Sequence, residues 1–168
     1  MLRLVNLSDS KILLEWRNSD EVRLGLFSQE TIVLESHEAW IRKALESKLK
    51  HLFIYEENEP CGFVQLDETG TDTGIYEWGF YKAPSAKKGV GGRMLSELLK
   101  HVFITLNAKK VVGKVLKYNE ASLRLHTKLG FEVEGIQKEQ HPLSGTYHDI
   151  VLFGLRISEY NKIEGEAH

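Results

Sequence analysis

The spacing of apolar residues alternates along the chain between the two-residue repeat of strands and the three-to-four-residue repeat of helices. It predicts strands at residues 2–7, 51–55, 62–66, 75–81 and 110–116, and two more from Glu132 and Tyr147, around a turn at 142–145. Helices are predicted from Ser8 or Asp9 to about Asn18, from Ser36 through Leu45, from Val90 to about Thr105, and from Asn119 to Gly130. Residues 20–35 and 67–74 are predicted as a loop and a turn. This alternation, with hairpins at both ends, indicates an α/β fold in which helices cover a mixed sheet.

Length and composition narrow the classes of protein. A chain of 168 residues suits one domain, 1–168, with a single sizeable core. The 22 Lys and Arg residues nearly balance the 24 Asp and Glu residues, so no overall charge favours nucleic acid or an anionic membrane. The first residues lack the apolar core of a signal peptide and no apolar run is long enough to cross a bilayer, so we expect a cytoplasmic protein. A lone Cys61 excludes an internal disulfide framework, and the histidine spacing predicts no metal site.

A run of small and basic residues, 83–93, stands between a predicted strand and a strongly amphipathic helix. Glycines allow close approach of a ligand to the backbone, and the first turn of a helix offers unpaired N–H groups and a positive dipole end. The run is neither a Walker loop nor a dinucleotide fingerprint. We therefore predict a site for an anion such as a pyrophosphate, made by Lys87, Lys88, Gly89, Val90, Gly91, Gly92 and Arg93.

A second segment, 119–135, is a short helix capped by Asn119, ended by Gly130 and followed by a strand. The two segments together resemble the acetyl-CoA motifs of the GCN5-related N-acetyltransferases, in the family's order. This resemblance implies a central seven-stranded sheet, mixed but mostly antiparallel, flanked by about four helices, with acetyl-CoA as co-substrate and no metal. The chain departs from the family pattern at Ala86, where Arg or Gln is usual, and at His126, where tyrosine is common.

Acetyl transfer from a thioester to an amine needs a neutral amine, an aligned carbonyl and a proton for the departing thiolate. Glu77, a carboxylate in an apolar strand, is the candidate to hold or deprotonate the amine, although an ion-paired structural glutamate fits it equally well. The resemblance implies that N–H groups near Phe80 and Tyr81 hold the thioester carbonyl. His126 is the candidate proton donor. It is also predicted to contact the coenzyme, as are Asn119 and Ser122.

The first third of the chain is expected to select the acceptor. It mixes aromatic, aliphatic and cationic residues, which suits a nucleotide-linked sugar. In this interpretation Arg17 and His37 bind phosphates, and Leu26, Phe27 and Trp40 pack against a base or a deoxy-sugar methyl, next to Glu77 and Tyr81. The alternative is structural: Trp40 can equally belong to the core, and Arg17 can cap helix carbonyls.

Residues from about Leu4 to Tyr160 resemble more narrowly the pseudaminic acid pathway enzymes. These acetylate the 4-amino group of UDP-4-amino-4,6-dideoxy-N-acetyl-β-L-altrosamine, a precursor for surface or flagellar glycans. The resemblance implies a small-molecule amine acceptor and direct transfer, and it leaves a homodimer open. Two other interpretations remain: a ribosomal-protein N-terminal or polyamine acetyltransferase, and a non-catalytic acyl-CoA sensor.

Overall fold

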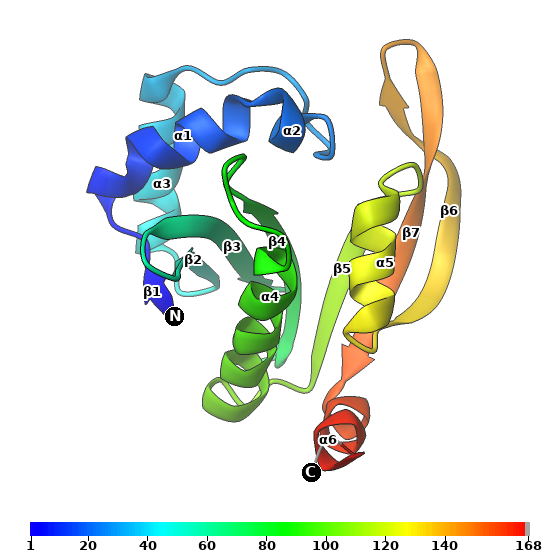
Figure 1. Cartoon of the computed structure of the whole chain (residues 1–168). Helices are drawn as coiled ribbons and strands as arrows, with labels where there is room; N and C mark the ends of the chain where they lie inside the picture. Colours follow the sequence, from blue (N-terminus) through cyan, green and yellow to red (C-terminus); the bar gives the residue numbers. More distant parts are fainter. Residues whose placement is uncertain (167–168) are drawn as a thin grey trace.

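The computed structural model describes residues 1–166 and contains one seven-stranded sheet with the order β1-β2-β3-β4-β5-β7-β6 (Figure 1). Neighbouring strands are antiparallel except β4 and β5, which are parallel. This confirms the mixed, mostly antiparallel sheet. The strands are β1 (Leu2–Leu4), β2 (Lys50–Glu56), β3 (Pro60–Glu68), β4 (Ile75–Lys82), β5 (Lys110–Leu116), β6 (Glu132–Leu143) and β7 (Thr146–Arg156).

Six α-helices accompany the sheet within these residues, more than the four expected. They are α1 (Ser10–Asn18), α2 (Asp20–Arg23), α3 (Leu34–Glu46), α4 (Val90–Lys100), α5 (Glu120–Lys128) and α6 (Ile157–Glu166). A π-helical segment, His101–Thr105, continues α4 and completes the helix predicted to Thr105. The sequence pattern missed α2 and α6. A single turn such as α2, with Val22 as its only buried residue, has no periodicity to detect.

The starts of the first two predicted helices differ from the prediction in their caps. α1 begins at Ser10, directly after the predicted Asp9, but the Asp9 side chain makes no cap hydrogen bond to α1. The first helical segment begins with a 3-10 turn, Leu7–Asp9, and Asn6 caps it: its side chain accepts from the Ser8 N–H, while the Asp9 side chain accepts from the Asn6 N–H. This reciprocal capping box replaces the predicted cap at Ser8 or Asp9. The second helix, α3, begins at Leu34, before the predicted cap at Ser36.

Helices cover both faces of the sheet, and each face has its own core. On one face α4 packs Met94, Leu95 and Leu98 against residues of β3, β4 and β5, all fully buried or nearly so. On the other face α1 and α3 pack Leu13 and Ile41 against β2 and β3. Because strand side chains alternate between faces, Trp78 and Phe80 belong to the α4 face, whereas Tyr81 packs with the α1 and α3 core.

The sheet opens between its two parallel strands. β4 and β5 pair only where Ile75 to Glu77 face Lys110 to Val112, although β4 continues to Lys82 and β5 to Leu116. β5 meanwhile stays paired with β7 along its whole length. The two halves therefore diverge beyond Glu77, with β4 on one side and β5, α5 and β7 on the other (Figure 1). The strand edges that face this gap have no strand partner there.

Candidate active site

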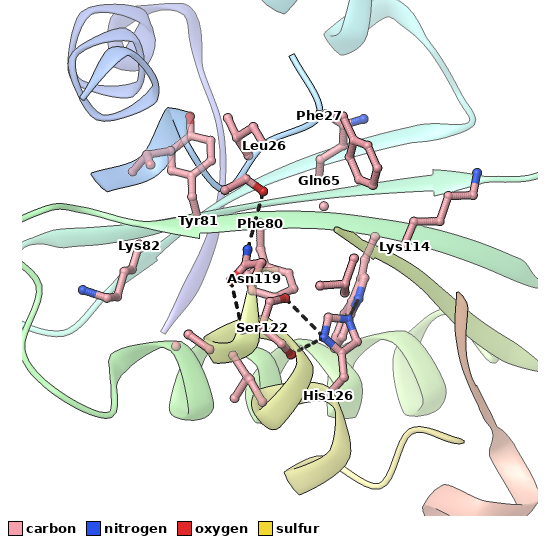
Figure 2. A pocket seen from close by; sticks show the side chains of 18 of the residues that line it. Leu26, Phe27, Gln65, Phe80, Tyr81, Lys82, Lys114, Asn119, Ser122 and His126 are labelled. Atoms are coloured by element: carbon pink, nitrogen blue, oxygen red, sulfur yellow. Dashed lines mark hydrogen bonds between the residues drawn. The ribbon is translucent and has the colours of Figure 1, made fainter. Parts of the chain in front are cut away.

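A cleft of about 430 Å³ occupies the gap between the diverging strands. Its lining comes from strands β3, β4 and β5, from helices α2, α4 and α5, and from the loops after α2 and before α4. In Figure 2, Leu26, Phe27, Gln65 and Lys114 lie on one side of β4, and Ser122 and His126 lie on the other. The cleft thus joins the two faces of the sheet along the edge of β4 that no longer pairs with β5, so that two ligands can reach it from opposite sides.

The first turn of α4 forms one end of this cleft. Gly89 precedes the helix with a φ of +88°, a left-handed conformation that a side chain would strain, and Gly91 lines the cleft. The Val90 N–H bonds to the Lys87 carbonyl at 3.3 Å, whereas the N–H groups of Gly91 and Gly92 have no partner within the helix and suit an anion. Arg93 is held aside by Glu57, with 2.7 Å between Nε and a carboxylate oxygen. Of the residues predicted to bind the anion, only Gly91 lines the cleft; the others, Lys87, Lys88, Gly89, Val90, Gly92 and Arg93, are outside its lining.

The start of α5 forms the facing wall. Asn119 caps this helix as predicted, because its side-chain oxygen accepts from the Ser122 N–H at 3.2 Å. Its amide nitrogen also reaches the Gly25 carbonyl at 3.5 Å. Asn119 and Ser122 therefore both line the cleft while the cap fixes their position.

His126 is buried beneath the cleft, with only 1% of its surface exposed. The indole N–H of Trp78 donates to Nε2 at 3.0 Å, so Nε2 carries no proton, because an indole nitrogen can only donate. The proton is therefore on Nδ1, which donates to the Ser122 carbonyl at 2.8 Å. Burial lowers the pKa of His126, with the hydrogen bond to Ser122 acting in the opposite direction. The ring is neutral and neither nitrogen is free to protonate a thiolate.

Two carboxylates on the opposite side of β4 are paired with lysines. A Glu77 oxygen lies 3.1 Å from the Lys114 ammonium, across the point where the strands diverge. Asp67 contacts Lys50 and the Gln65 amide. Between Glu77 and Tyr81 a Cβ built on Gly79 would meet nothing within 4 Å, so this part of the cleft has open space beside Glu77.

The loop after α2 covers this side of the cleft and is held to the opposite half of the molecule. The His141 ring on β6 donates to the Phe27 carbonyl at 2.8 Å and stacks edge-on against the Phe27 ring. Tyr118 donates to the Leu24 carbonyl at 2.9 Å and accepts from Gln29 at 2.7 Å. The loop therefore spans the gap between the diverging halves.

Comparison with known proteins identifies the family to which the chain belongs. The family model described as "Acetyltransferase (GNAT) domain" matches residues 1–132. The chain belongs to the GNAT acetyltransferase family. A curated relative is an N-acetyltransferase of Bacillus subtilis, prophage-derived YokL, 28% identical over 130 residues, which are 75% of this chain and 72% of that protein.

Two further similarities are one in sequence and one in structure. The acetyltransferase PseH of Campylobacter jejuni is 24% identical over 136 residues, covering 80% of this chain and 84% of that protein. The structure of spermidine N-acetyltransferase from Vibrio cholerae in complex with CoA and spermine superposes with a TM-score of 0.89 at 22% identity, over 96% of this chain and 97% of that one. At this identity the likeness shows a shared fold.

As a GNAT N-acetyltransferase the protein is an enzyme that uses acetyl-CoA as acetyl donor. The residues at the cleft fit this co-substrate. The bare first turn of α4 suits its pyrophosphate, and the unpaired edge of β4 from Trp78 to Lys82 offers peptide groups to its pantetheine arm and thioester. Within residues 1–166 no group of three or more His, Cys, Asp or Glu side chains is arranged to hold a metal ion. None of the helices described is long and apolar enough to cross a membrane.

Three residues expected to contact the acceptor lie outside the GNAT cleft. The Arg17 guanidinium is buried and donates to the carbonyls of Ser28 and Glu30, at 2.7 and 3.3 Å. Arg17 thus shapes the loop that bears Leu26 and Phe27. His37 is 4% exposed and stacks on Trp40, which in turn packs against Phe63. The packing of Trp40 agrees with its structural interpretation, whereas the carbonyls that Arg17 binds belong to a loop and not to a helix. None of the three residues lines the cleft.

The structure does bring most of the other predicted residues together. Glu77, Phe80, Tyr81, Leu26 and Phe27 line the cleft with those of α4 and α5 described above. The Tyr81 hydroxyl donates to the Leu13 carbonyl at 3.3 Å, and burial raises its pKa, so it ties α1 to the end of β4. Sequence reasoning missed other polar lining residues: Glu21, Gln65, Asp67, Lys82 and Lys114. The two-residue repeat of the 110–116 strand could have found Lys114, because it puts this lysine opposite the apolar Val111 and Val115.

Proposed function

We propose that this GNAT enzyme acetylates the 4-amino group of a UDP-linked 4-amino-4,6-dideoxy sugar. The observation that carries the proposal is the charge of the acceptor side of the cleft. Of its three carboxylates, Glu77 and Asp67 each have a lysine partner, and only Glu21 has no ion pair among the described residues. A polycationic amine would need several free carboxylates here, whereas an amine on a neutral or anionic carrier would not.

The apolar surface on the same side also supports a deoxy sugar. Leu26 and Phe27 line the cleft opposite the open space at Gly79, and Arg17 and His141 hold the loop that bears them. Apolar side chains beside a few placed polar groups are typical of small-molecule sites. The similarity to PseH and the resemblance of residues 4–160 to the pseudaminic acid pathway enzymes point to the same acceptor.

The proposed reaction is direct transfer between the two sides of β4. The amine would enter at Gly79 and lose its proton to Glu77, directly or through water. Its nitrogen lone pair would attack the thioester carbonyl carbon, whose oxygen would be held by N–H groups of β4 near Phe80 and Tyr81. The C–S bond would then break. After the attack the nitrogen carries a positive charge and one more proton to lose. Because both His126 nitrogens are engaged, the leaving thiolate would take this proton from the nitrogen, directly or through water, which gives the amide and the free thiol.

The specificity constants of different acceptors test this proposal. Release of free CoA thiol is followed with acetyl-CoA and one of three amines: the UDP-4-amino-4,6-dideoxy sugar, spermidine, or a peptide with the N-terminus of a ribosomal protein. We expect kcat/KM for the nucleotide sugar to exceed the other two by at least about tenfold, a difference of roughly 1.4 kcal/mol in transition-state binding. A higher value for spermidine or for the peptide would replace the proposed acceptor.

A further inference from the structure

We propose that Lys114 determines acceptor specificity by favouring amines on an anionic carrier and disfavouring polycations. The proposal rests on the proposed function, because it concerns the acceptor side of the same cleft. It assigns a role to a residue outside both coenzyme segments, on a strand that the sequence pattern identifies only as buried.

The position of Lys114 follows from the strand geometry. Val111 and Val115 on β5 point into the core beneath α4, so Lys114 points to the other face, where Glu77 of β4 also lies. Lys114 stands two residues beyond Val112, the last β5 residue that pairs with β4. Figure 2 shows its side chain on the same side of β4 as Phe27 and Gln65. It therefore stands at the entrance to the split, on the acceptor's side.

Lys114 sets the charge around the reacting amine. Its ammonium lies 3.1 Å from Glu77 and neutralises the one carboxylate next to the open space at Gly79. Both side chains are partly exposed, at 46% for Lys114 and 37% for Glu77, so an incoming ligand can reach them. A polyamine would bring a second cation against this ammonium, at a cost in binding. A phosphate or carboxylate on the acceptor would instead gain a charge-assisted contact.

The other cation in the lining does not duplicate this role. Lys82 is at the far end of β4, and Figure 2 shows it on the opposite side of the view from Lys114. Without Lys114, Glu77 would have no cationic partner among the described residues, and Glu21, Asp67 and Glu77 would outnumber Lys82 in the lining. One substitution should therefore change the charge preference of the site.

Affinities measured by calorimetry in the presence of CoA test this role without depending on turnover. The probes are the UDP-4-amino-4,6-dideoxy sugar and spermidine, and the quantity compared is the ratio of their Kd values. Lys114→Met should change this ratio about fivefold in favour of spermidine, the effect of one partly exposed charge, and Lys114→Glu should change it further. Lys114→Arg should restore it to within about twofold. Lys110→Met is the matched control, because Lys110 lies on the same strand, pairs with Glu134 and is outside the cleft.

The outcomes separate the two proposals. If the wild type binds spermidine more tightly than the nucleotide sugar, yet the ratio still changes as expected in Lys114→Met and Lys114→Glu, the proposed acceptor is wrong and the role of Lys114 stands. If the nucleotide sugar is preferred and the ratio is the same in all Lys114 variants, the proposed function stands and this inference is overturned. Equal changes in Lys110→Met would also overturn it. Binding of neither ligand to any variant would overturn both.

Discussion

At the level of single residues, His126 shows how the surroundings determine chemistry. The sequence places a titratable ring on α5, where the family often has a tyrosine, and predicts a proton donor. The structure surrounds the ring with Trp78, Phe131 and Phe153 and gives each nitrogen a partner. Trp78 is 48 residues away in the sequence, so local pattern could not find this contact. We infer that His126 acts in packing, where it joins α5 to β4 below the cleft.

This interpretation predicts a loss of stability without a matching loss of rate in His126→Phe. The substitution leaves the buried Trp78 N–H without a partner, which costs about 1–3 kcal/mol of unfolding free energy. The Ser122 carbonyl loses the imidazole but keeps its helical backbone bond in α5. His126→Gln keeps an acceptor for Trp78 and should lose less. Urea unfolding and turnover are measured on the same preparations. If turnover instead slows by about two orders of magnitude while stability is unchanged, His126 is the proton donor after all.

The burial of His126 determines in which direction the free energy of unfolding changes with pH. Because the pKa of His126 is lowered in the folded state, the unfolded chain binds more protons below its pKa of about 6.5. The contribution of the neutral His126 to the free energy of unfolding is therefore present above that pH. It is lost as the pH falls below it. Burial also lowers the pKa of His37 and His101. Stability should fall between pH 7 and pH 5, and less steeply in His126→Phe, where one of the three groups is absent.

At the level of elements, the first turn of α4 carries the coenzyme prediction. Gly91→Val adds a side chain whose Cβ meets the Leu125 side chain at 3.5 Å, an ordinary contact, so the variant should fold. The added methyl groups would stand where a pyrophosphate approaches the backbone. We expect the Kd of acetyl-CoA, measured by calorimetry, to rise more than tenfold. Circular dichroism serves as the folding control, and unchanged affinity in a folded variant would refute the assignment of this turn.

β4 offers the complementary test on the acceptor side. Gly79→Val places a β-branched residue, which suits a strand, into open space beside Glu77. The fold and the Kd of acetyl-CoA should be retained, while kcat/KM for the acceptor should fall about tenfold or more because the approach of the amine is blocked. If Gly79→Val weakens acetyl-CoA binding as much as Gly91→Val does, the two ligands share one side of β4 and the proposed division of the cleft is wrong.

The elements that the sequence predicted share strong periodicity. The amphipathic stripe of α4 and the apolar positions of β2 to β5 belong to residues that the two cores bury. α2 is a single turn, and α6 follows β7 directly with a weakly amphipathic, largely exposed surface, so neither has such a stripe. Some helix boundaries, such as the one at Asn6, are set by side-chain caps. The spacing of apolar residues carries no information about these hydrogen bonds.

At the level of the whole molecule, the loop after α2 ties together two halves that the sheet leaves apart. Its contacts with Tyr118 and His141 come from residues about 90 to 115 positions away. From the sequence we predict that Leu26 and Phe27 pack against the acceptor substrate, and the structure places both side chains in the lining of the cleft. It could not show that Arg17 is used inside the fold, because the carbonyls that Arg17 binds belong to an irregular loop.

His141→Ala should loosen this loop. The substitution removes one hydrogen bond to the Phe27 carbonyl and the ring contact with Phe27, a loss of about 1 kcal/mol or a little more. KM for the acceptor should rise about fivefold, and the Kd of acetyl-CoA should stay within about twofold because α4 is far from this contact. Tyr147→Ala, at an exposed position of β7 outside the cleft lining, is a control that leaves the Phe27 contact in place. Equal effects of both variants on KM would contradict a specific role of His141.

In the proposed reaction, acetyl passes directly from the coenzyme on one side of β4 to a nucleotide-linked amine on the other. The most direct measurement uses NMR to follow the acetyl group of acetyl-CoA labelled with ¹³C in its carbonyl. The sample contains the UDP-4-amino-4,6-dideoxy sugar and a catalytic amount of the protein. Direct transfer predicts a single new amide carbonyl signal coupled to the sugar's 4-amino group, with no acetylated protein by intact mass. If the ¹³C label is found on the protein when no acceptor is present, direct transfer is contradicted. If spermidine is acetylated and the sugar is not, the proposed acceptor is contradicted.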